Sequence, residues 1–167
     1  ATAIGLDFSP PGGTTLAEAV TSAPAPPAPS ASFSDPLLIV YTSGTTGRPK
    51  GAVLTQQALF ANGIMSQHMH GLTGDDHVLT VLPFFHVGGL NIQTTPALHQ
   101  GATVTIHARF TPDGTLAAIA QARPTLAVLV PATMQALIGH PGWADVDLSC
   151  LRAISTGMVY GAATPIH

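Results

Sequence analysis

Hydrophobic and polar positions along the chain follow two periods, which predict strands and helices in turn. Short apolar runs bounded by Gly, Pro or polar residues predict strands at 37–41, 53–54, 77–82, 102–106, 125–130 and 151–155. Longer segments with apolar residues three or four positions apart predict helices at 56–70, 89–99, 111–122 and 131–138. This alternation is typical of α/β folds, so we expect a mostly parallel sheet flanked by helices.

Capping residues mark several of these boundaries. Thr55 is placed to cap the helix at 56–70, and Gly71 is placed to end it. The run Thr111-Pro112-Asp113 supplies a cap, a proline in the first helical position and an early acid. We expect the strand at 37–41 to be buried. Four side chains of the first helix are expected to face the core, namely Leu59, Phe60, Ile64 and Met65.

The first part of the chain is weakly patterned. A short helix is predicted at 14–20, with Thr14 or Thr15 as its cap. Residues 21–30 are rich in Pro and Ala and predict an exposed connector. We therefore divide the chain into a segment with its connector at 1–36 and a partial domain at 37–167.

Composition narrows the class of protein. Only 8% of the 167 residues are charged, whereas 46% are hydrophobic. A small free-standing domain needs more charge on its surface, so we expect an interior piece of a larger chain. The net charge is −3, and Arg109, Arg123 and Arg152 are scattered singly along the sequence. The sequence therefore shows no basic patch that could bind nucleic acid. The absence of a long apolar run, of a secretory signal and of a second cysteine beside Cys150 favours a cytoplasmic protein without a membrane span.

The segment 41–51 is rich in hydroxyl groups and glycines and contains Lys50. Backbone amides of a glycine-rich loop can form a concavity for anions, and a lysine adds a point charge that phosphates attract. The spacing differs from the Walker A loop, because Lys50 is followed by Gly51 rather than by Ser or Thr. We interpret the segment as a polyphosphate loop; from composition alone, the alternative is a polar surface turn.

A second informative segment, 82–90, directly follows a predicted strand. Parallel sheets bind ligands outside the carboxyl ends of their strands. Phe84, Phe85 and Val87 offer an apolar wall there, and His86 offers one titratable group. The alternative is a buried turn whose histidine only satisfies a nearby carbonyl.

These segments together resemble the adenylate-forming superfamily, which includes acyl-CoA synthetases, luciferases and peptide-synthetase adenylation domains. The word Tyr-Thr-Ser-Gly-Thr-Thr-Gly-Arg-Pro-Lys-Gly at 41–51 is similar to its phosphate-loop signature, and Pro-Phe-Phe-His at 83–86 to its substrate-pocket segment. Leu-Ser-Cys-Leu-Arg at 148–152 resembles the run before a glycine-bearing pocket loop, here 155–157. The resemblance is strongest to fatty-acyl-CoA synthetases. It covers about 37–157, an incomplete piece of the large N-terminal domain.

The resemblance implies activation of a carboxylic acid with ATP, Mg²⁺ and CoA; the acid expected first is a fatty acid, and an aryl acid is the alternative. Catalytic roles fall on Lys50, Thr45 and His86. The implied phosphate contacts are Thr42, Ser43, Gly44, Thr45, Thr46, Gly47 and Lys50. The implied substrate pocket comprises Phe84, Phe85, His86, Val87, Gly88, Ser155, Thr156 and Gly157. No resident metal ligands are assigned, and the oligomeric state stays open.

Departures from the family pattern leave alternatives open. After Gly157 the sequence leaves the usual pattern, and the family's downstream catalytic Glu, Asp and Lys motifs lie beyond His167. This piece alone is therefore expected to be inactive. The parent could also be an aryl-CoA ligase, a peptide-synthetase adenylation domain or a non-catalytic nucleotide-binding remnant.

The remaining polar residues predict structure rather than chemistry. We interpret His68, His70 and His77 as solvated surface residues, and Asp75-Asp76 as the end of a turn. Met134 and Leu137 are predicted core residues. Cys150 is predicted to be an inert buried thiol.

Overall fold

The computed structural model describes residues 30–42 and 49–156, together with 4–5, 14–15, 18 and 21. The chain divides into two compact units, 1–32 and 33–167. In the first unit, strand β1 (Ile4–Gly5) pairs in parallel with strand β2 (Thr14–Thr15). The helix predicted from Thr14 is therefore wrong at its start. Most of the predicted connector at 21–30 lies outside the described residues.

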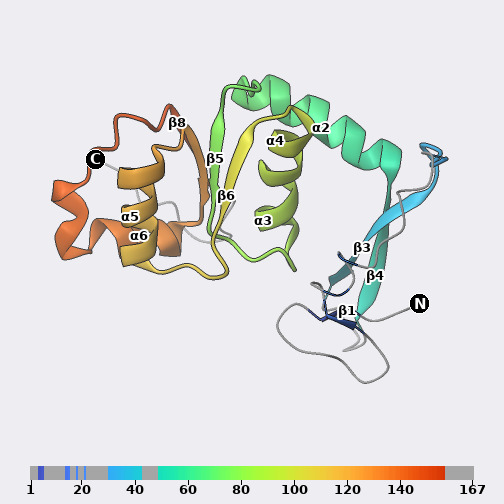
Figure 1. Cartoon of the computed structure of the whole chain (residues 1–167), viewed down its shortest axis with the longest axis horizontal. Helices are drawn as coiled ribbons and strands as arrows, with labels where there is room; N and C mark the ends of the chain where they lie inside the picture. Colours follow the sequence, from blue (N-terminus) through green and yellow to red (C-terminus); the bar gives the residue numbers. More distant parts are fainter. Residues whose placement is uncertain are drawn as a thin grey trace. The chain divides into compact units, whose positions relative to one another are not determined.

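A four-stranded parallel sheet forms the centre of the second unit, in the order β6-β5-β7-β8 (Figure 1). Its strands are β5 (His77–Thr80), β6 (Thr103–Ile106), β7 (Leu126–Leu129) and β8 (Ala153–Thr156). Every residue of β7 is buried, as expected for a central strand covered on both faces. The predicted α/β class is confirmed.

Helices cover both faces of this sheet. They are α2 (Gln56–His70), α3 (Val87–Asn91), α4 (Thr94–His99), α5 (Pro112–Ala122), α6 (Pro131–Ile138) and the 3-10 helix η1 (Pro141–Asp145). On one face, Leu79 and Leu129 pack with Leu116, Ile119 and Leu137 of α5 and α6. On the other face, Val78 and Leu126 pack with Leu72 and with Ala97 of α4. Alternate residues of each strand thus supply two cores.

The caps predicted at Thr55, Gly71 and Thr111 are confirmed. The side chain of Thr55 accepts a hydrogen bond from the amide of Ala58, and that of Thr111 accepts one from the amide of Gly114. Gly71 ends α2 in the left-handed conformation, with φ 57°. The bounds of α2 match the prediction, because these local signals lie at both of its ends, and the bounds of α6 match as well.

The single helix predicted at 89–99 is wrong, because the chain forms α3 and α4 with a break at Ile92 and Gln93. Pro96 has no amide hydrogen, so it cannot donate to the carbonyl of Ile92 as a continuous helix requires. The hydroxyl of Ser66 donates to that carbonyl instead, at 2.8 Å. The amide of Asn62 likewise donates to the carbonyl of Asn91, at 2.7 Å.

The break explains why the inward face of α2 differs from the prediction. Phe60, Ile64 and Met65 are exposed, whereas Gly63 and Ser66 are the buried residues of this helix. The inward face carries small and polar residues because it approaches α3 and α4 closely and supplies donors to their freed carbonyls. Local need for hydrogen bonds has therefore overridden hydrophobic periodicity.

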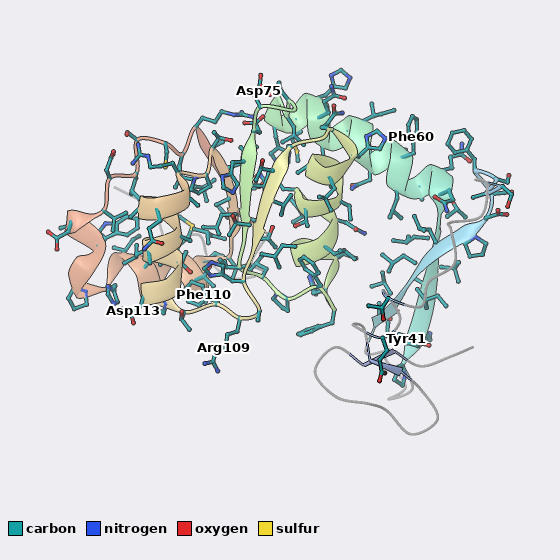
Figure 2. All side chains as sticks on the ribbon, viewed as in Figure 1. Tyr41, Phe60, Asp75, Arg109, Phe110 and Asp113 are labelled. Carbon is teal, nitrogen blue, oxygen red and sulfur yellow. The ribbon has the colours of Figure 1, made fainter. Side chains whose placement is uncertain are left out.

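The strand predicted at 37–41 forms, but not as a buried strand. Strand β3 (Pro36–Thr42) pairs antiparallel with β4 (Lys50–Thr55) in a separate two-stranded sheet. Leu37, Ile39 and Tyr41 are 50%, 54% and 68% exposed, and Figure 2 labels Tyr41 on this hairpin. The prediction of burial was wrong because, among the described residues, β3 has one partner strand and stays outside the parallel sheet.

Candidate functional site

The β3–β4 hairpin holds both ends of the predicted phosphate loop. Thr42 and Lys50 lie directly opposite each other, and the hydroxyl of Thr42 donates to the carbonyl of Lys50 at 3.4 Å. The side chain of Lys50 is exposed. Five predicted phosphate contacts lie outside the described residues, namely Ser43, Gly44, Thr45, Thr46 and Gly47. The hairpin thus fixes the entry and the exit of the loop.

His86 stands at the start of α3, after the turn that follows β5. Its Nδ1 accepts a hydrogen bond from the amide of Gly88 at 2.9 Å, so the side chain caps the helix. This differs from the carbonyl contact considered from the sequence. In the neutral ring the proton must then lie on Nε2, which is left as a donor.

The two glycines of this segment, Gly88 and Gly89, have different surroundings. A Cβ on Gly89 would lie 2.5 Å from the carbonyl oxygen of Pro83 and 2.6 Å from that of Leu82. The close backbone approach therefore requires glycine, with no ligand involved. At Gly88 the nearest atom would be Nδ1 of His86, at 3.0 Å.

Two buried threonines fix α3 to the end of β5. The hydroxyl of Thr94 donates to the carbonyl of Gly89 at 2.7 Å, and Thr80 and Thr94 are joined through their hydroxyls at 2.7 Å. Because Thr94 uses its own hydrogen on Gly89, Thr80 is the donor in the second bond. The position of His86 is therefore set by the sheet.

A groove of about 860 Å³ lies among α2, the turn after β5, α3 and the end of β7. Its apolar wall consists mainly of Met65, Met69, Phe85, Ile92, Val128 and Val130. Its polar groups include Asn62, Ser66 and His86. It lies at the carboxyl ends of β5 and β7, where parallel sheets place ligands. An elongated or flat apolar molecule with one polar end suits such a lining.

The structure brings only part of the predicted pocket to this groove. Phe85, His86, Val87 and Gly88 line it, whereas Phe84 is absent from the lining. Ser155, predicted at the junction of a strand and the pocket loop, and Thr156, predicted in that loop, are the last residues of β8 and are likewise absent from the lining. Gly157 lies outside the described residues. Sequence reasoning missed Met69 and placed Met65 in the core, because α2 was expected to turn another face inward. It missed Ile92 because a continuous helix was expected at 89–99.

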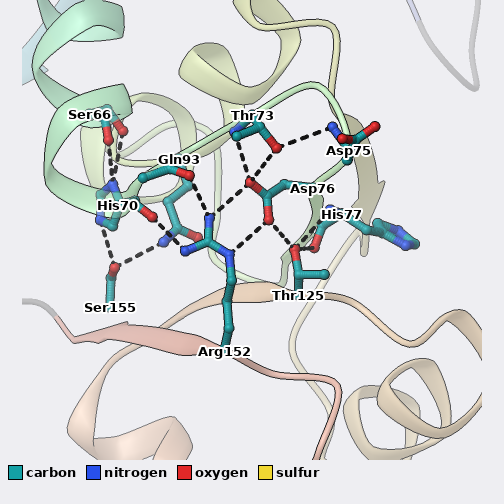
Figure 3. A network of polar contacts seen from close by, with 11 residues as sticks. Ser66, His70, Thr73, Asp75, Asp76, His77, Gln93, Thr125, Arg152 and Ser155 are labelled. Carbon is teal, nitrogen blue, oxygen red and sulfur yellow. Dashed lines mark hydrogen bonds and ion pairs between the residues drawn. The ribbon is translucent and has the colours of Figure 1, made fainter.

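A network of polar contacts ties together the amino ends of three strands and the end of α2 (Figure 3). The carboxylate of Asp76 is buried and accepts from Nε and Nη2 of Arg152 at 2.9 and 2.8 Å. It also accepts from the hydroxyl of Thr125 at 2.6 Å and from the amide of Thr73 at 2.8 Å. The guanidinium of Arg152 holds the pKa of Asp76 well below its usual range, although burial opposes this.

The same guanidinium closes the end of α2. Arg152 donates from Nη1 to the carbonyl of His70 at 2.6 Å and from Nη2 to that of Gly71 at 3.1 Å. The sequence had suggested only a turn at Asp76 and an isolated cation at Arg152. A signal existed, because Asp76, Thr125 and Arg152 each stand just before a strand, and parallel strands begin at one edge of a sheet.

Two of the three histidines predicted as solvated are hydrogen-bonded instead. Nε2 of His70 lies 2.8 Å from the hydroxyl of Ser155, and Nε2 of His77 lies 2.7 Å from that of Thr105. His68 is exposed. Within the described ranges, no group of three or more His, Cys, Asp or Glu side chains is arranged to hold a metal ion.

The remaining structural predictions have simple outcomes. Leu137 is buried and Met134 packs against the same core, as predicted. Cys150 is only half-buried at the edge of this core, rather than buried. None of the helices in the described segments is long and apolar enough to span a bilayer.

Known proteins with similar sequences include two enzymes that are named after aromatic acids. The chain is 59% identical to the indoleacetate–CoA ligase of Aromatoleum aromaticum over 122 residues, which are 73% of this chain and 24% of the ligase. It is 41% identical to a feruloyl-CoA synthase of Amycolatopsis over 133 residues, which are 80% of this chain and 26% of the synthase. The chain thus spans about a quarter of the length of these relatives.

Among solved structures, the chain is similar to the inhibitor-bound N-terminal domain of FACL13 from Mycobacterium tuberculosis. The TM-score is 0.77 at 30% identity, over 96% of this chain and 41% of that one. The sequence matches the family of AMP-binding enzymes over residues 2–166. The chain therefore belongs to the AMP-binding enzyme family and folds as part of the N-terminal domain of an adenylate-forming enzyme.

Proposed function

We propose that the protein carrying this chain is an AMP-forming ligase that joins an aromatic carboxylic acid to CoA. The acid carboxylate attacks the α-phosphorus of ATP, and pyrophosphate leaves. The thiol sulfur of CoA then attacks the acyl carbon, AMP leaves and the thiol proton is released. The observation that carries this proposal is the apolar groove at the carboxyl edge of the sheet, with His86 among its few polar groups.

The groove favours a flat apolar acid. Met65 and Met69 offer polarizable sulfur atoms that attract aromatic rings, and Phe85 offers an aromatic face. Gly88 is buried in the lining and adds no side chain of its own. The two relatives named for indoleacetate and feruloyl groups point the same way. We therefore replace the fatty acid expected from the sequence with an aromatic acid.

The proposed roles divide between the hairpin and the groove. Lys50 and the loop at 42–47 hold the β- and γ-phosphates of ATP and the departing pyrophosphate, since a cation and backbone amides stabilise the charge that develops there. Nε2 of His86 donates a hydrogen bond toward the carboxylate or the adenylate oxygen. Positioning supplies most of the rate enhancement.

Mg²⁺ and CoA enter the proposal as partners of this reaction. The described residues include no cluster of carboxylates that could hold a metal ion, so we assign Mg²⁺ to the phosphates of ATP. The ion supplies neutralising charge at those phosphates when ATP is bound. A cytoplasmic location is part of the proposal, since the lone Cys150 needs no oxidising compartment.

The test is ATP–pyrophosphate exchange by the full-length protein with aromatic, short-chain, medium-chain and long-chain acids. We expect exchange that depends on aromatic acids and falls about 100-fold in Lys50→Ala, as for the loss of one charge-stabilising group. Arg109→Ala, which removes an exposed cation outside the motifs, is the matched control and should exchange normally.

Three results would change the proposal. Preference for long-chain acids would restore the fatty-acid assignment. Exchange without CoA-dependent AMP release would favour a peptide-synthetase adenylation domain. A folded full-length protein that exchanges with no acid would leave a nucleotide-binding remnant.

A further inference from the structure

A chain of hydrogen-bonded polar side chains links three elements of the fold (Figure 3). We call it the polar relay: Gln93 before α4, Ser155 of β8, and His70 and Ser66 of α2. The amide nitrogen of Gln93 lies 2.9 Å from the hydroxyl of Ser155. That hydroxyl lies 2.8 Å from Nε2 of His70, whose Nδ1 lies 3.0 Å from the carbonyl of Ser66.

The chemistry of these atoms fixes the direction of each hydrogen bond. The carbonyl of Ser66 can only accept, and the hydroxyl of Ser66, which lies 3.1 Å from Nδ1, gives its own hydrogen to the carbonyl of Ile92, so Nδ1 of His70 carries the proton. Nε2 of the neutral ring then accepts from the hydroxyl of Ser155, and this hydroxyl accepts from Gln93. The relay therefore requires the Nδ1–H tautomer at His70, opposite to the tautomer required at His86.

The relay touches the groove lining at three points. Ser66 lines the groove and donates to the carbonyl of Ile92, another lining residue, at 2.8 Å. Val128, a third lining residue, lies directly opposite Ser155 in the β7–β8 ladder. A shift of the relay would therefore move the α2, α3 and β7 sides of the groove.

Stability alone does not account for the relay. Gln93 is fully buried, and its amide oxygen has no hydrogen-bond partner in the described part of the chain. Burying an unpaired amide oxygen is unfavourable, and an apolar side chain would fill the same space without this cost. We therefore attribute the presence of glutamine at this position to its side-chain NH₂ group, which donates to the hydroxyl of Ser155 and orients it.

We propose that Gln93 and His70 are positioning residues for the groove. They hold the hydroxyl of Ser155 from two sides and so fix the end of β8 against the groove wall. Ser155 was expected to line the pocket, but its hydroxyl points into the relay and acts through the backbone. This inference rests on the proposed function, because it assigns the relay to binding of the acid.

The kinetic experiment uses two pairs of variants of the full-length enzyme. Ser155→Thr keeps the hydroxyl, whereas Ser155→Val has nearly the same shape without it. His70→Gln keeps a donor and an acceptor, whereas His70→Leu has neither. We expect Ser155→Val and His70→Leu to raise the KM for the acid about tenfold, the effect of one lost buried hydrogen bond. The KM for ATP should stay within about twofold, and the first member of each pair should stay near wild type.

A double variant tests whether Ser155 and His70 are energetically coupled. If the two residues act in one relay, the Ser155→Val/His70→Leu double variant should be no worse than either single variant. Equal effects within each pair, additive effects in the double variant, or a joint rise of both KM values would overturn the proposal and leave a purely structural contact.

A spectroscopic test separates this inference from the proposed function. In ¹⁵N-histidine-labelled full-length protein, the ring signals that disappear in His70→Gln belong to His70. We expect them to show the Nδ1–H tautomer in the wild type and to keep it in Ser155→Val, because the carbonyl of Ser66 still accepts from Nδ1, whereas the Nε2 signal should shift with the loss of its hydrogen bond from Ser155. An Nε2–H ring at His70 in the wild type would overturn the relay even if the enzyme is an active ligase. A failed exchange assay with the expected tautomer would overturn the function and leave the relay geometry intact.

Discussion

The parallel sheet and the β3–β4 hairpin contain similar apolar sequences in opposite environments. All four residues of β7 are buried, whereas Leu37, Ile39 and Tyr41 of β3 are at least half exposed. The difference lies in the neighbours, because β7 has a strand on each side and helices on both faces, while β3 pairs only with β4 among the described residues. Apolar β-prone residues thus predict a strand, but the surrounding elements determine its burial.

Polar groups differ between the two regions in the same way. The sheet region buries Asp76, Thr80 and Thr94, and each forms hydrogen bonds within the protein. The hairpin exposes Thr42 and Lys50 at its loop end. One region therefore uses its polar groups to fix packed elements, whereas the other leaves polar side chains exposed.

The largest expected difference in stability is between a side-chain truncation in the core and a matched truncation in the hairpin. Leu126→Ala removes a fully buried side chain and should lower the free energy of unfolding by about 3 kcal/mol. Ile39→Ala, at a half-exposed position, should cost less than about 1 kcal/mol. Urea denaturation of the full-length protein measures both. Equal losses would show that another part of the protein covers the hairpin.

The next contrast compares a buried with an exposed ion pair. Asp76→Asn should lower the free energy of unfolding by about 2 to 3 kcal/mol, because the buried carboxylate that pairs with Arg152 is removed. The loss should be no larger, because Arg152 is partly exposed and water can solvate its charge. Asp147→Asn is the control, since this exposed acid has its pKa lowered to about 2 by hydrogen bonds from Ser149 and Arg123. Its effect should be clearly smaller.

The pH dependence of this pair follows from the sign of the shift. The pKa of Asp76 is lower in the folded than in the unfolded state, where it is about 3.9. Its stabilisation is therefore complete above pH ~4 and is lost as the pH falls toward the folded value. Asp76→Asn should flatten the stability profile below pH ~4. A profile unchanged by the substitution would contradict the assignment.

Glycine substitutions distinguish rigid from adaptable surroundings. A Cβ at Gly89 would meet backbone carbonyls, whereas a Cβ at Gly51 in the hairpin would meet the Cγ2 methyl of the exposed Ile39 side chain at 2.8 Å. Gly89→Ala should cost about 2 kcal/mol, because the backbone of the turn must move. Gly51→Ala should change stability by less than about 0.5 kcal/mol, because an exposed side chain can rotate. Thermal unfolding of the two variants checks this, and equal shifts would show that the turn is adaptable.

The last pair of variants should show no difference in stability between the core and the hairpin. Thr111→Ala and Thr55→Ala each remove one capping hydrogen bond, the first in a helix packed on the core and the second where the hairpin meets α2. Each should cost about 1 kcal/mol, because capping depends on the helix end itself. The corresponding Ser variants, which keep the hydroxyl, should restore stability. A difference above about 1 kcal/mol between the two sites would show that tertiary packing contributes to one cap.

The sequence by itself determined the class, several boundaries and the family resemblance of this protein. Caps at Thr55, Gly71 and Thr111 and the motif at 41–51 are local, since each acts within a few residues. Only the tertiary structure decided which face of α2 turns inward, where the helix after Gly89 breaks, and that His70 meets Ser155. These features depend on carbonyls and side chains brought together from distant segments, such as Asp76 and Arg152. Hydrophobic periodicity carries no record of such long-range hydrogen bonds, because they are set by how the packed elements meet.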